Sequence, residues 1–210
     1  MKKFTAIASF LFFGAMLYAE AAKEIALPKP DLKSGKPFMQ CVAERRSKRQ
    51  FNSKPLPMQI IGEILYVADG VSGKDGRKTV PTARNKQNQS VYAFTADGIY
   101  FYNSGKHALQ LVKKGDFRSI CGKQPFHKKA PLVLVFVSDM KAVGNTAEEQ
   151  AMYAGNHSGS ASQNVYLYAA SKDLSTVVCG MLDRDALKKL LNLKADQQVI
   201  YSQPVAYPAK

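Results

Sequence analysis

Residues 160–171 read SASQNVYLYAAS, a segment without a charged side chain. Ala161, Val165 and Tyr168 recur at helical spacing, and small or apolar residues surround them. A helix that is apolar on most of its sides is buried on most of its sides. We therefore expect a helix over residues 160–171 at the centre of the fold, preceded by a shorter helix over residues 146–154.

The strands are predicted by apolar runs on either side of this helix. Residues 132–137 read LVLVFV, a continuous β-branched run typical of a strand that is buried on both faces. Residues 90–95 and 99–103 flank an Ala-Asp-Gly turn, which is a hairpin signal. Residues 199–207 are predicted to form a terminal strand broken by Pro204.

Periodicity, glycines and caps predict the remaining elements. Further helices are expected at residues 38–46, 56–69, 107–112 and 183–191. Gly70 ends the second of these, and Asp183 caps the last. This mixture predicts an α+β fold in which a central, mostly antiparallel sheet is flanked by helices.

The amino terminus has the three-part plan of a secretory signal peptide. Two lysines precede an uncharged apolar run over residues 4–18, and Ala19-Glu20-Ala21 supplies a small-residue cleavage site. An uncleaved anchor is the alternative, but the run of about 15 residues is shorter than a membrane-spanning helix requires. We predict a signal peptide over residues 1–21, a linker over residues 22–37, a domain over residues 38–210 and an exported, periplasmic protein.

Charge and cysteine content limit the partners and the chemistry. The formal net charge of +14 favours anionic partners, such as a phosphorylated cofactor or an anionic cell-envelope surface. Nucleic acid is not expected, because an exported protein rarely meets it. The three cysteines form no CxxC pair, and neither they nor the three histidines have metal-ligand spacing, so no metal site is predicted. We expect the cysteines to be small buried residues.

A basic cluster over residues 44–49 is the first candidate binding site. The segment reads ERRSKR and follows a short apolar helix. Arg grips phosphate with two parallel hydrogen bonds, and Ser47 adds a neutral donor, so a phosphate-bearing ligand is one interpretation. The other is a solvated basic patch that contacts anionic lipid or polymer.

The order of these features resembles the nitroreductase family of FMN-dependent flavoproteins. Residues 45–49 are similar to the family's Arg-x-Ser-x-Arg motif, and residues 81–85 resemble its Pro-Ser-x-x-Asn loop. Residues 159–169 resemble its central helix at the dimer interface, and residues 174–180 resemble the segment that faces the flavin ring. The likeness therefore extends over nearly the whole domain.

The resemblance implies a nitroreductase-like FMN-binding domain over residues 38–210 and an intertwined homodimer. It implies that Arg45 and Arg49 neutralise the phosphate, that Arg46 reaches the pyrimidine edge of the ring, and that the loop at residues 81–85 comes from the partner subunit. The implied cofactor-binding residues are Arg45, Arg46, Ser47, Arg49, Pro81, Thr82, Ala83, Asn85, Gln163, Val178, Cys179 and Gly180. The catalytic side chains stay unassigned, and flavin chemistry of this type needs no dedicated protein nucleophile.

Some of these residues also have simpler interpretations. Pro81 and Asn85 are ordinary turn residues, Gln163 fits an interface hydrogen bond, and Cys179 fits a space-filling role. His157 stands where many relatives have an acidic residue, and Lys210 is the late cation left for the phosphate.

The resemblance implies an oxidoreductase that transfers hydride through flavin N5 to or from a small organic substrate. A nitroaromatic, a quinone or an envelope metabolite would fit this description. Residues 97–102 and 107–109 are similar to the branch that contains azoline-oxidising dehydrogenases of thiazole and oxazole synthesis. Two alternatives remain: a degenerate flavin- or anion-binding module without turnover, and a basic protein that binds envelope polymer without flavin.

Overall fold

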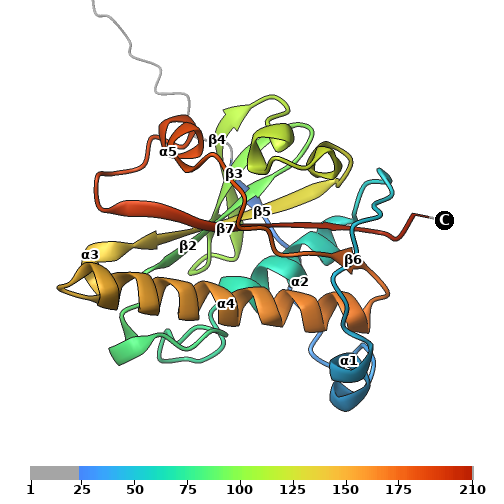
Figure 1. Cartoon of the computed structure of the whole chain (residues 1–210). Helices are drawn as coiled ribbons and strands as arrows, with labels where there is room; N and C mark the ends of the chain where they lie inside the picture. Colours follow the sequence, from blue (N-terminus) through green and yellow to red (C-terminus); the bar gives the residue numbers. More distant parts are fainter. Residues whose placement is uncertain (1–23, 210) are drawn as a thin grey trace, which may run out of the picture.

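The structure is a computed structural model and describes residues 24–209, so the predicted signal peptide and Lys210 lie outside the described residues. Within that range one sheet has the strand order β1-β4-β3-β2-β5-β7-β6, and each pair of neighbouring strands is antiparallel (Figure 1). The strands are β1 (Glu24–Ala26), β2 (Gln89–Phe94), β3 (Gly98–Asn103), β4 (Ala108–Lys114), β5 (Leu132–Asp139), β6 (Ser175–Thr176) and β7 (Gln197–Ala206). The predicted α+β fold with an antiparallel sheet is confirmed.

Helices cover both faces of this sheet. The α-helices are α1 (Phe38–Glu44), α2 (Met58–Asp69), α3 (Met140–Val143), α4 (Ala147–Ser171) and α5 (Arg184–Leu190). Short 3-10 turns lie at η1 (Ala83–Asn85), η2 (Arg118–Cys121) and η3 (Pro125–Lys128). Helices α2 and α4 lie on one face, and α5 lies on the other (Figure 1). Within residues 24–209, no helix is both long and apolar enough to cross a membrane.

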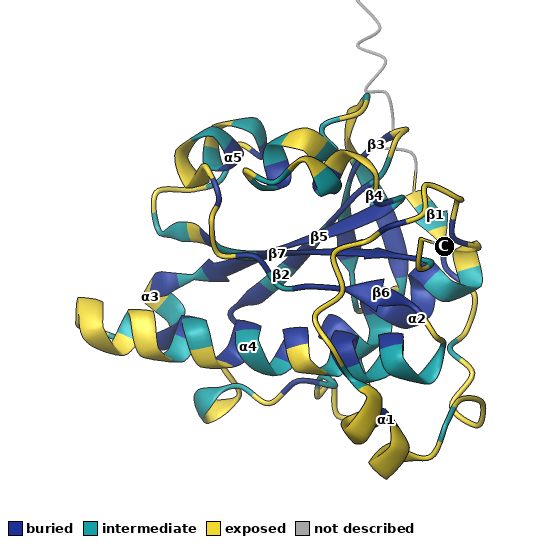
Figure 2. Ribbon diagram, turned by 45° about the vertical axis from the view of Figure 1, so that its right-hand side comes forward, coloured by how far each residue is buried: buried dark blue, intermediate teal, exposed yellow. Residues whose placement is uncertain are grey.

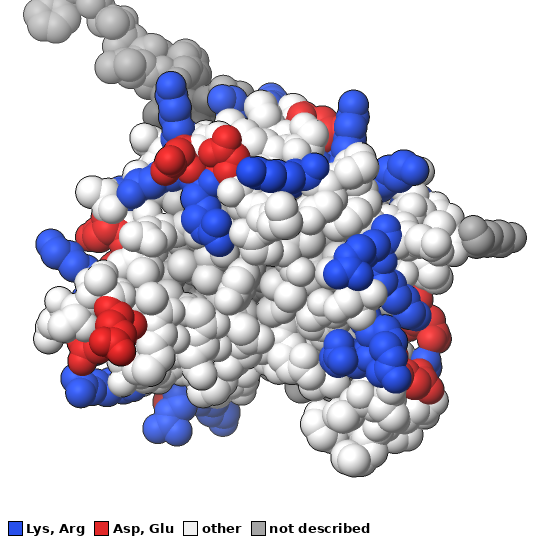
Figure 3. Space-filling model, in the orientation of Figure 1, with Lys and Arg blue, Asp and Glu red and all other residues white. Residues whose placement is uncertain are grey.

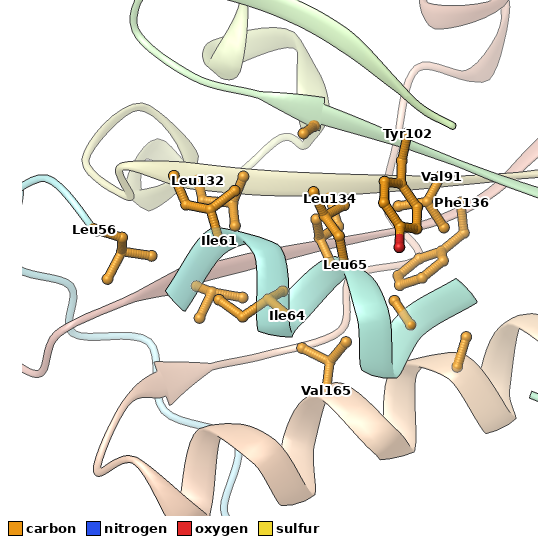
Figure 4. Packing of buried hydrophobic residues seen from close by; sticks show 14 of the residues in the cluster. Leu56, Ile61, Ile64, Leu65, Val91, Tyr102, Leu132, Leu134, Phe136 and Val165 are labelled. Carbon is orange, nitrogen blue, oxygen red and sulfur yellow. The ribbon is translucent and has the colours of Figure 1, made fainter. Parts of the chain in front are cut away.

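The main core lies between the sheet and the α2–α4 layer. Figure 4 shows α2 between the sheet and α4, with Val165 pointing from α4 toward α2. Ile64, Leu65 and Leu134 are completely buried there, and burying one such side chain contributes about 1.5–3 kcal/mol. Strand β5 is buried on both faces, as predicted, and the central strands appear dark blue in Figure 2. The core therefore fixes α4 against the sheet.

Helix α4 corrects one prediction. The sequence predicted two helices separated near Gly155 and Gly159, but a single helix of 25 residues runs through both glycines. A glycine costs a helix about 1 kcal/mol relative to alanine, and the packing of Ala161 and Val165 in the core outweighs that preference. Thr146 caps the helix by accepting a hydrogen bond from Glu149 N–H at 3.2 Å.

Two other predictions were wrong, and one strand was missed. The predicted helix at residues 107–112 is strand β4, because these residues pair with β3 on one side and β1 on the other. Pro204 does not break β7, since its carbonyl accepts a hydrogen bond from Thr176 Oγ1 at 2.8 Å and the ladder continues past it. Strand β1 lies inside the segment predicted as a linker.

Other sequence predictions are confirmed. Asp183 caps α5 by accepting a hydrogen bond from Ala186 N–H at 2.9 Å. The helix α2 ends before Gly70, where a Cβ atom would lie 2.6 Å from the Tyr66 carbonyl oxygen, so close packing requires glycine there. All three cysteines are free and buried. These local rules succeeded where they agreed with the tertiary packing.

Candidate functional site

The basic cluster lies beside the carboxy-terminal half of α4, where the chain leaves α1 (Figure 1). The Tyr166 hydroxyl of α4 accepts a hydrogen bond from Val178 N–H at 2.9 Å and shares another with Ser47 Oγ at 2.8 Å. The guanidinium of Arg45 lies over the Tyr166 ring, 5.3 Å from its centroid. One buried tyrosine therefore joins the basic segment, the central helix and the segment before α5.

The positive charges of this cluster are not neutralised within the described chain. None of the described carboxylates forms an ion pair with Arg45, Arg46 or Arg49. The nearest acidic neighbour in sequence, Glu44, instead pairs with Lys36 at 2.8 Å. Figure 3 shows Lys and Arg side chains gathered beside α1. A cluster of this kind attracts an anion, because like charges close together repel one another.

The cations point in different directions. Arg46 donates hydrogen bonds to the carbonyl oxygens of Ala43 at 3.1 Å and of Arg45 at 2.8 Å, so in the isolated chain it turns back toward the end of α1. Arg49 is exposed, and its charge partly opposes the rise that burial causes in the pKa of the Cys179 thiol. Arg49 therefore lies near the segment at residues 176–180.

That segment is held by backbone pairing on both sides. Lys48 N–H donates to the Thr176 carbonyl at 3.0 Å, and Cys179 exchanges backbone hydrogen bonds with Ser202 of β7. Burial raises the pKa of the Cys179 thiol to about 11, and Arg49 opposes this only in part. The thiol is therefore protonated at neutral pH and is not a nucleophile. Gly180 follows at the surface, where a Cβ atom would reach nothing nearer than Tyr201 at 4.0 Å.

The loop at residues 81–85 has a strained backbone. Arg84 and Asn85 have φ values of 53° and 52°, and Gln87 has a φ of 45°. Left-handed conformations at residues other than glycine cost on the order of 1–3 kcal/mol each. Ala83 N–H donates to His157 Nε2 at 2.8 Å, and Gln87 N–H donates to Thr82 Oγ1 at 3.0 Å. These bonds hold the loop in its shape.

His157 connects this loop to the sheet. Because Nε2 accepts a hydrogen bond from Ala83 N–H, the ring proton lies on Nδ1, which donates to Asn88 Oδ1 at 2.7 Å. Asn88 Nδ2 in turn donates to Ser138 Oγ at 2.6 Å. Burial lowers the pKa of His157 below its ordinary value of 6.5. The neutral imidazole is the form that this arrangement requires.

The two groups of predicted residues lie at different places along α4. The structure brings Arg45, Ser47 and Val178 together at Tyr166 and Arg49 near Cys179, whereas the loop at residues 81–85 contacts α4 at His157. His157 and Tyr166 are nine residues apart on α4, which is about 14 Å along a helix. Gln163 lies between them and is exposed. A single chain therefore does not place the loop against the basic cluster.

The exposed side of α4 between these positions carries no charge. Residues 158–165 contain no Asp, Glu, Lys, Arg or His side chain. A Cβ atom on Gly159 would meet nothing within 4 Å, and Gln163 is exposed. Figure 3 shows an uncharged surface across α4, with the charges at its margins. On α1, Phe38 is 67% and Met39 72% exposed. This surface has the character of an interface.

Tyr166 and the structural role of His157 were missed by the sequence analysis. Tyr166 was passed over because its neighbours already explained a buried helix. A tyrosine on the buried side of a helix needs a partner for its hydroxyl, and that requirement could have singled it out. His157 was noted only as a departure from the family pattern, although a buried histidine also needs hydrogen-bond partners.

Comparison with known proteins identifies the family. A model of the nitroreductase family matches residues 42–207, which is most of the chain. The chain belongs to the nitroreductase family. This family of oxidoreductases accounts for the α+β fold and for the order of the motifs.

Two relatives match this nitroreductase-family chain over most of their own length. A nitroreductase-type protein of Methanocaldococcus jannaschii is 29% identical over 162 residues, covering 72% of this chain and 82% of that protein. The crystal structure of another, from Ralstonia eutropha JMP134, has a TM-score of 0.84 and 34% identity, and the match covers 89% of this chain and 90% of that one.

A more distant structure was solved with a ligand. A nitroreductase-type protein from Desulfovibrio desulfuricans, in complex with FMN, has a TM-score of 0.60 and 18% identity. The match covers 84% of this chain and 89% of that chain. At this level of identity the likeness shows the fold alone.

Proposed function

We propose that this protein is an exported, homodimeric, FMN-dependent oxidoreductase that acts on a small organic substrate. The observation that carries the proposal is the Tyr166 hydroxyl, which joins Ser47 to Val178 N–H at 2.8 and 2.9 Å. This contact places a cluster of unpaired cations next to a backbone segment with open space in front of Gly180. A ligand with an anionic tail and a flat ring matches both parts.

The residues present fit the phosphate end of FMN. A phosphate dianion needs several charged donors, and Arg45 and Arg49 supply them without competing carboxylates in the described chain. Ser47 already shares a hydrogen bond with Tyr166 and has capacity for another to the phosphate or the ribityl chain. Arg46 would leave the carbonyl oxygens at the end of α1 to reach the pyrimidine edge of the ring.

The residues also fit the ring of FMN. Gly180 allows a flat ligand to approach the backbone, since no side chain fills the space before it. When bound, FMN supplies the transfer of hydride to and from its N5 atom. The protein's part is to orient the ring with the backbone of Val178–Gly180 and to stabilise charge on it with Arg46.

A second copy of the chain completes the site in this proposal. The loop at residues 81–85 lies about 14 Å along α4 from the basic cluster, and an uncharged surface separates them. Two copies packed through this surface about a two-fold axis bring the loop of one to the cluster of the other. Asn85 then offers its amide to the ring or the ribityl chain, and Gln163 lies at the interface.

The visible absorption spectrum of the purified protein tests the cofactor, and light scattering tests the dimer. We expect a yellow protein with two FMN molecules per dimer. Anaerobic addition of reduced donors should bleach the flavin, and a quinone or nitroaromatic should restore it. Bound flavin that no donor reduces would indicate the alternative of a binding module without turnover. A colourless protein that takes up no FMN would reject the proposal.

Export and substrate are separate parts of the proposal. Export is supported by the sequence of residues 1–21, and fractionation of cells that express the full chain tests it. NAD(P)H is scarce outside the cytoplasm, so an exported enzyme requires another donor or acts as a dehydrogenase on an envelope substrate. The resemblance to azoline-oxidising dehydrogenases stays a prediction, which turnover of a thiazoline would test.

A further inference from the structure

A basic cavity lies beside the strained loop and apart from the Arg45–Arg49 cluster. It has a volume of about 300 Å³ and lies between the loop, α3 and the first turns of α4. Its wall carries three cationic side chains, Arg84, Lys86 and Lys141, and one carboxylate, Glu149. Figure 3 shows Lys and Arg side chains below the amino-terminal half of α4. This cavity therefore carries an excess of positive charge.

The positive charge is available to a ligand. Within residues 24–209, Arg84, Lys86 and Lys141 form no ion pair. Glu149 is the one carboxylate of the lining, and its Oε2 accepts a hydrogen bond from Asn145 N–H at 2.9 Å, so three cations outnumber one anion here. The start of α4 is already capped by Thr146, so the attraction for an anion comes from the three side chains.

Arg84 is held in place by the loop. The neighbouring Ala83 is fixed by the hydrogen bond to His157, and Arg84 itself has a φ of 53°. A side chain on a fixed backbone loses less freedom when it binds a ligand than one on a mobile loop. Arg84 is therefore the cation of the three best placed to give directional recognition, since its fork matches a carboxylate.

A second cavity adjoins the first. It has a volume of about 350 Å³, and Ala83 and Tyr153 line both cavities. Its other lining residues include Pro81, Met152 and His157, so it is bounded mainly by apolar and aromatic groups. The His157 and Tyr153 rings are stacked, with centroids 5.9 Å apart. The two adjoining cavities, called the groove below, therefore offer one cationic wall and one apolar wall.

We propose that this groove binds a planar aromatic carboxylate, with the carboxylate at Arg84 and Lys141 and the ring against Tyr153. The proposal that this anion is the enzyme's substrate rests on the proposed function, because the loop at residues 81–85 then borders the partner's flavin. The binding of the anion to the groove does not depend on flavin. Specificity for a negative charge follows from the unpaired cations, and specificity for a flat ring follows from the apolar end.

The test compares 4-nitrobenzoate with its uncharged analogue 4-nitrobenzamide by isothermal titration calorimetry on the full protein. We expect the carboxylate to bind at least about tenfold more tightly, because a charge-assisted hydrogen bond is lost with the amide. Arg84→Gln and Lys141→Gln should each reduce this preference. Lys74→Gln removes an exposed charge that lines neither cavity, and it should keep the preference.

Each outcome decides one proposal. Equal binding of the two ligands, or equal effects of Arg84→Gln and Lys74→Gln, would overturn the groove as a site and indicate a diffuse surface field. The visible spectrum of the same samples reports FMN separately. A preference for the carboxylate without any flavin would support the groove and reject the proposed function. Bound flavin without a preference for the carboxylate would support the proposed function and reject the groove as a binding site.

Discussion

The two ends of the candidate site are held to the same helix by different chemistry. At Tyr166, a hydroxyl joins α4 to Ser47 and to the backbone of Val178. At His157, a neutral imidazole holds a loop in which Arg84 and Asn85 adopt left-handed conformations. The contact at Tyr166 is made by a hydroxyl, whereas the contact at His157 requires a neutral imidazole, which burial favours by lowering the pKa of the ring. The half of the site at Tyr166 is therefore preformed, whereas the half at His157 is held in a strained conformation.

Removing the charge at the preformed half should have the largest effect. Arg49→Ala should weaken FMN binding by about ten- to hundredfold, because a charge-assisted Arg–phosphate pair is lost. Lys48→Ala is the matched control, since Lys48 is an exposed cation in the same segment, and it should change affinity only a few-fold. Fluorescence titration of the flavin-free protein with FMN measures both. Equal losses would mean that a general positive field, and not a directed contact, holds the phosphate.

Removing the Tyr166 hydroxyl, which joins the three segments, should have the second-largest effect. Tyr166→Phe leaves Val178 N–H and Ser47 without their partner, and we expect a loss of about 1–2 kcal/mol in the free energy of unfolding. FMN affinity should fall by about tenfold if the two segments move apart. Urea denaturation and FMN titration measure the two effects.

Tyr92→Phe provides the control for this substitution. Tyr92 lies in β2, and its hydroxyl forms no hydrogen bond within residues 24–209. Loss of that hydroxyl should leave both quantities nearly unchanged. If Tyr166→Phe behaves in the same way as Tyr92→Phe, the hydroxyl of Tyr166 does not organise the site.

The difference between local sequence patterns and long-range contacts explains which parts of the fold the sequence could predict. Residues 132–137 could be assigned because an apolar β-branched run leaves few other structures. Strand β4 could not be assigned from the sequence, because its residues also fit a short helix. Only their pairing with β1 and β3 makes them a strand. The glycines of α4 predicted a break for the same reason, because local propensity does not include the packing of Val165 in the core.

The segments of the candidate site were predictable from the sequence, but the contacts that hold them to α4 were not. The basic cluster and the loop at residues 81–85 stand out because arginine runs and Pro-x-x-x-Asn patterns are visible in one dimension. The contact of Ser47 with Tyr166 links residues 119 positions apart, and that of Ala83 with His157 links residues 74 apart. Such contacts depend on how α4 lies against the sheet, which one sequence does not reveal.

The contact between His157 and the loop at residues 81–85 should be sensitive to acid. Burial lowers the pKa of His157, so below its ordinary value of 6.5 the unfolded chain binds a proton that the folded chain does not. Stability contributed by the neutral ring is therefore present above pH 6.5 and is lost as the pH falls toward the lowered pKa. His157→Gln cannot take up this proton. Between pH 7 and pH 5 we therefore expect the free energy of unfolding to fall further for wild type than for His157→Gln.

Urea denaturation at pH 7 and pH 5 measures this difference. His127, whose pKa burial also lowers, and Asp69, whose pKa burial raises to about 6, also make the stability depend on pH. Both are present in wild type and in His157→Gln, so their contributions cancel in the comparison. Parallel pH profiles for the two proteins would show that the loop does not depend on the charge state of His157.

The smallest effect on stability is expected at Gly180, on the open side of the preformed half. A Cβ atom there would lie 4.0 Å from Tyr201 and touch nothing else, so Gly180→Ala should change the free energy of unfolding by less than about 0.5 kcal/mol. Gly70→Ala is the contrasting variant, because its Cβ would lie 2.4 Å from the Tyr66 ring, and it should be clearly destabilised. If a flat coenzyme lies against the backbone at Gly180, Gly180→Ala should still weaken FMN binding by several-fold. Unchanged binding would place the ring elsewhere, whereas a large loss of stability would mean that the chain itself fills the space before Gly180.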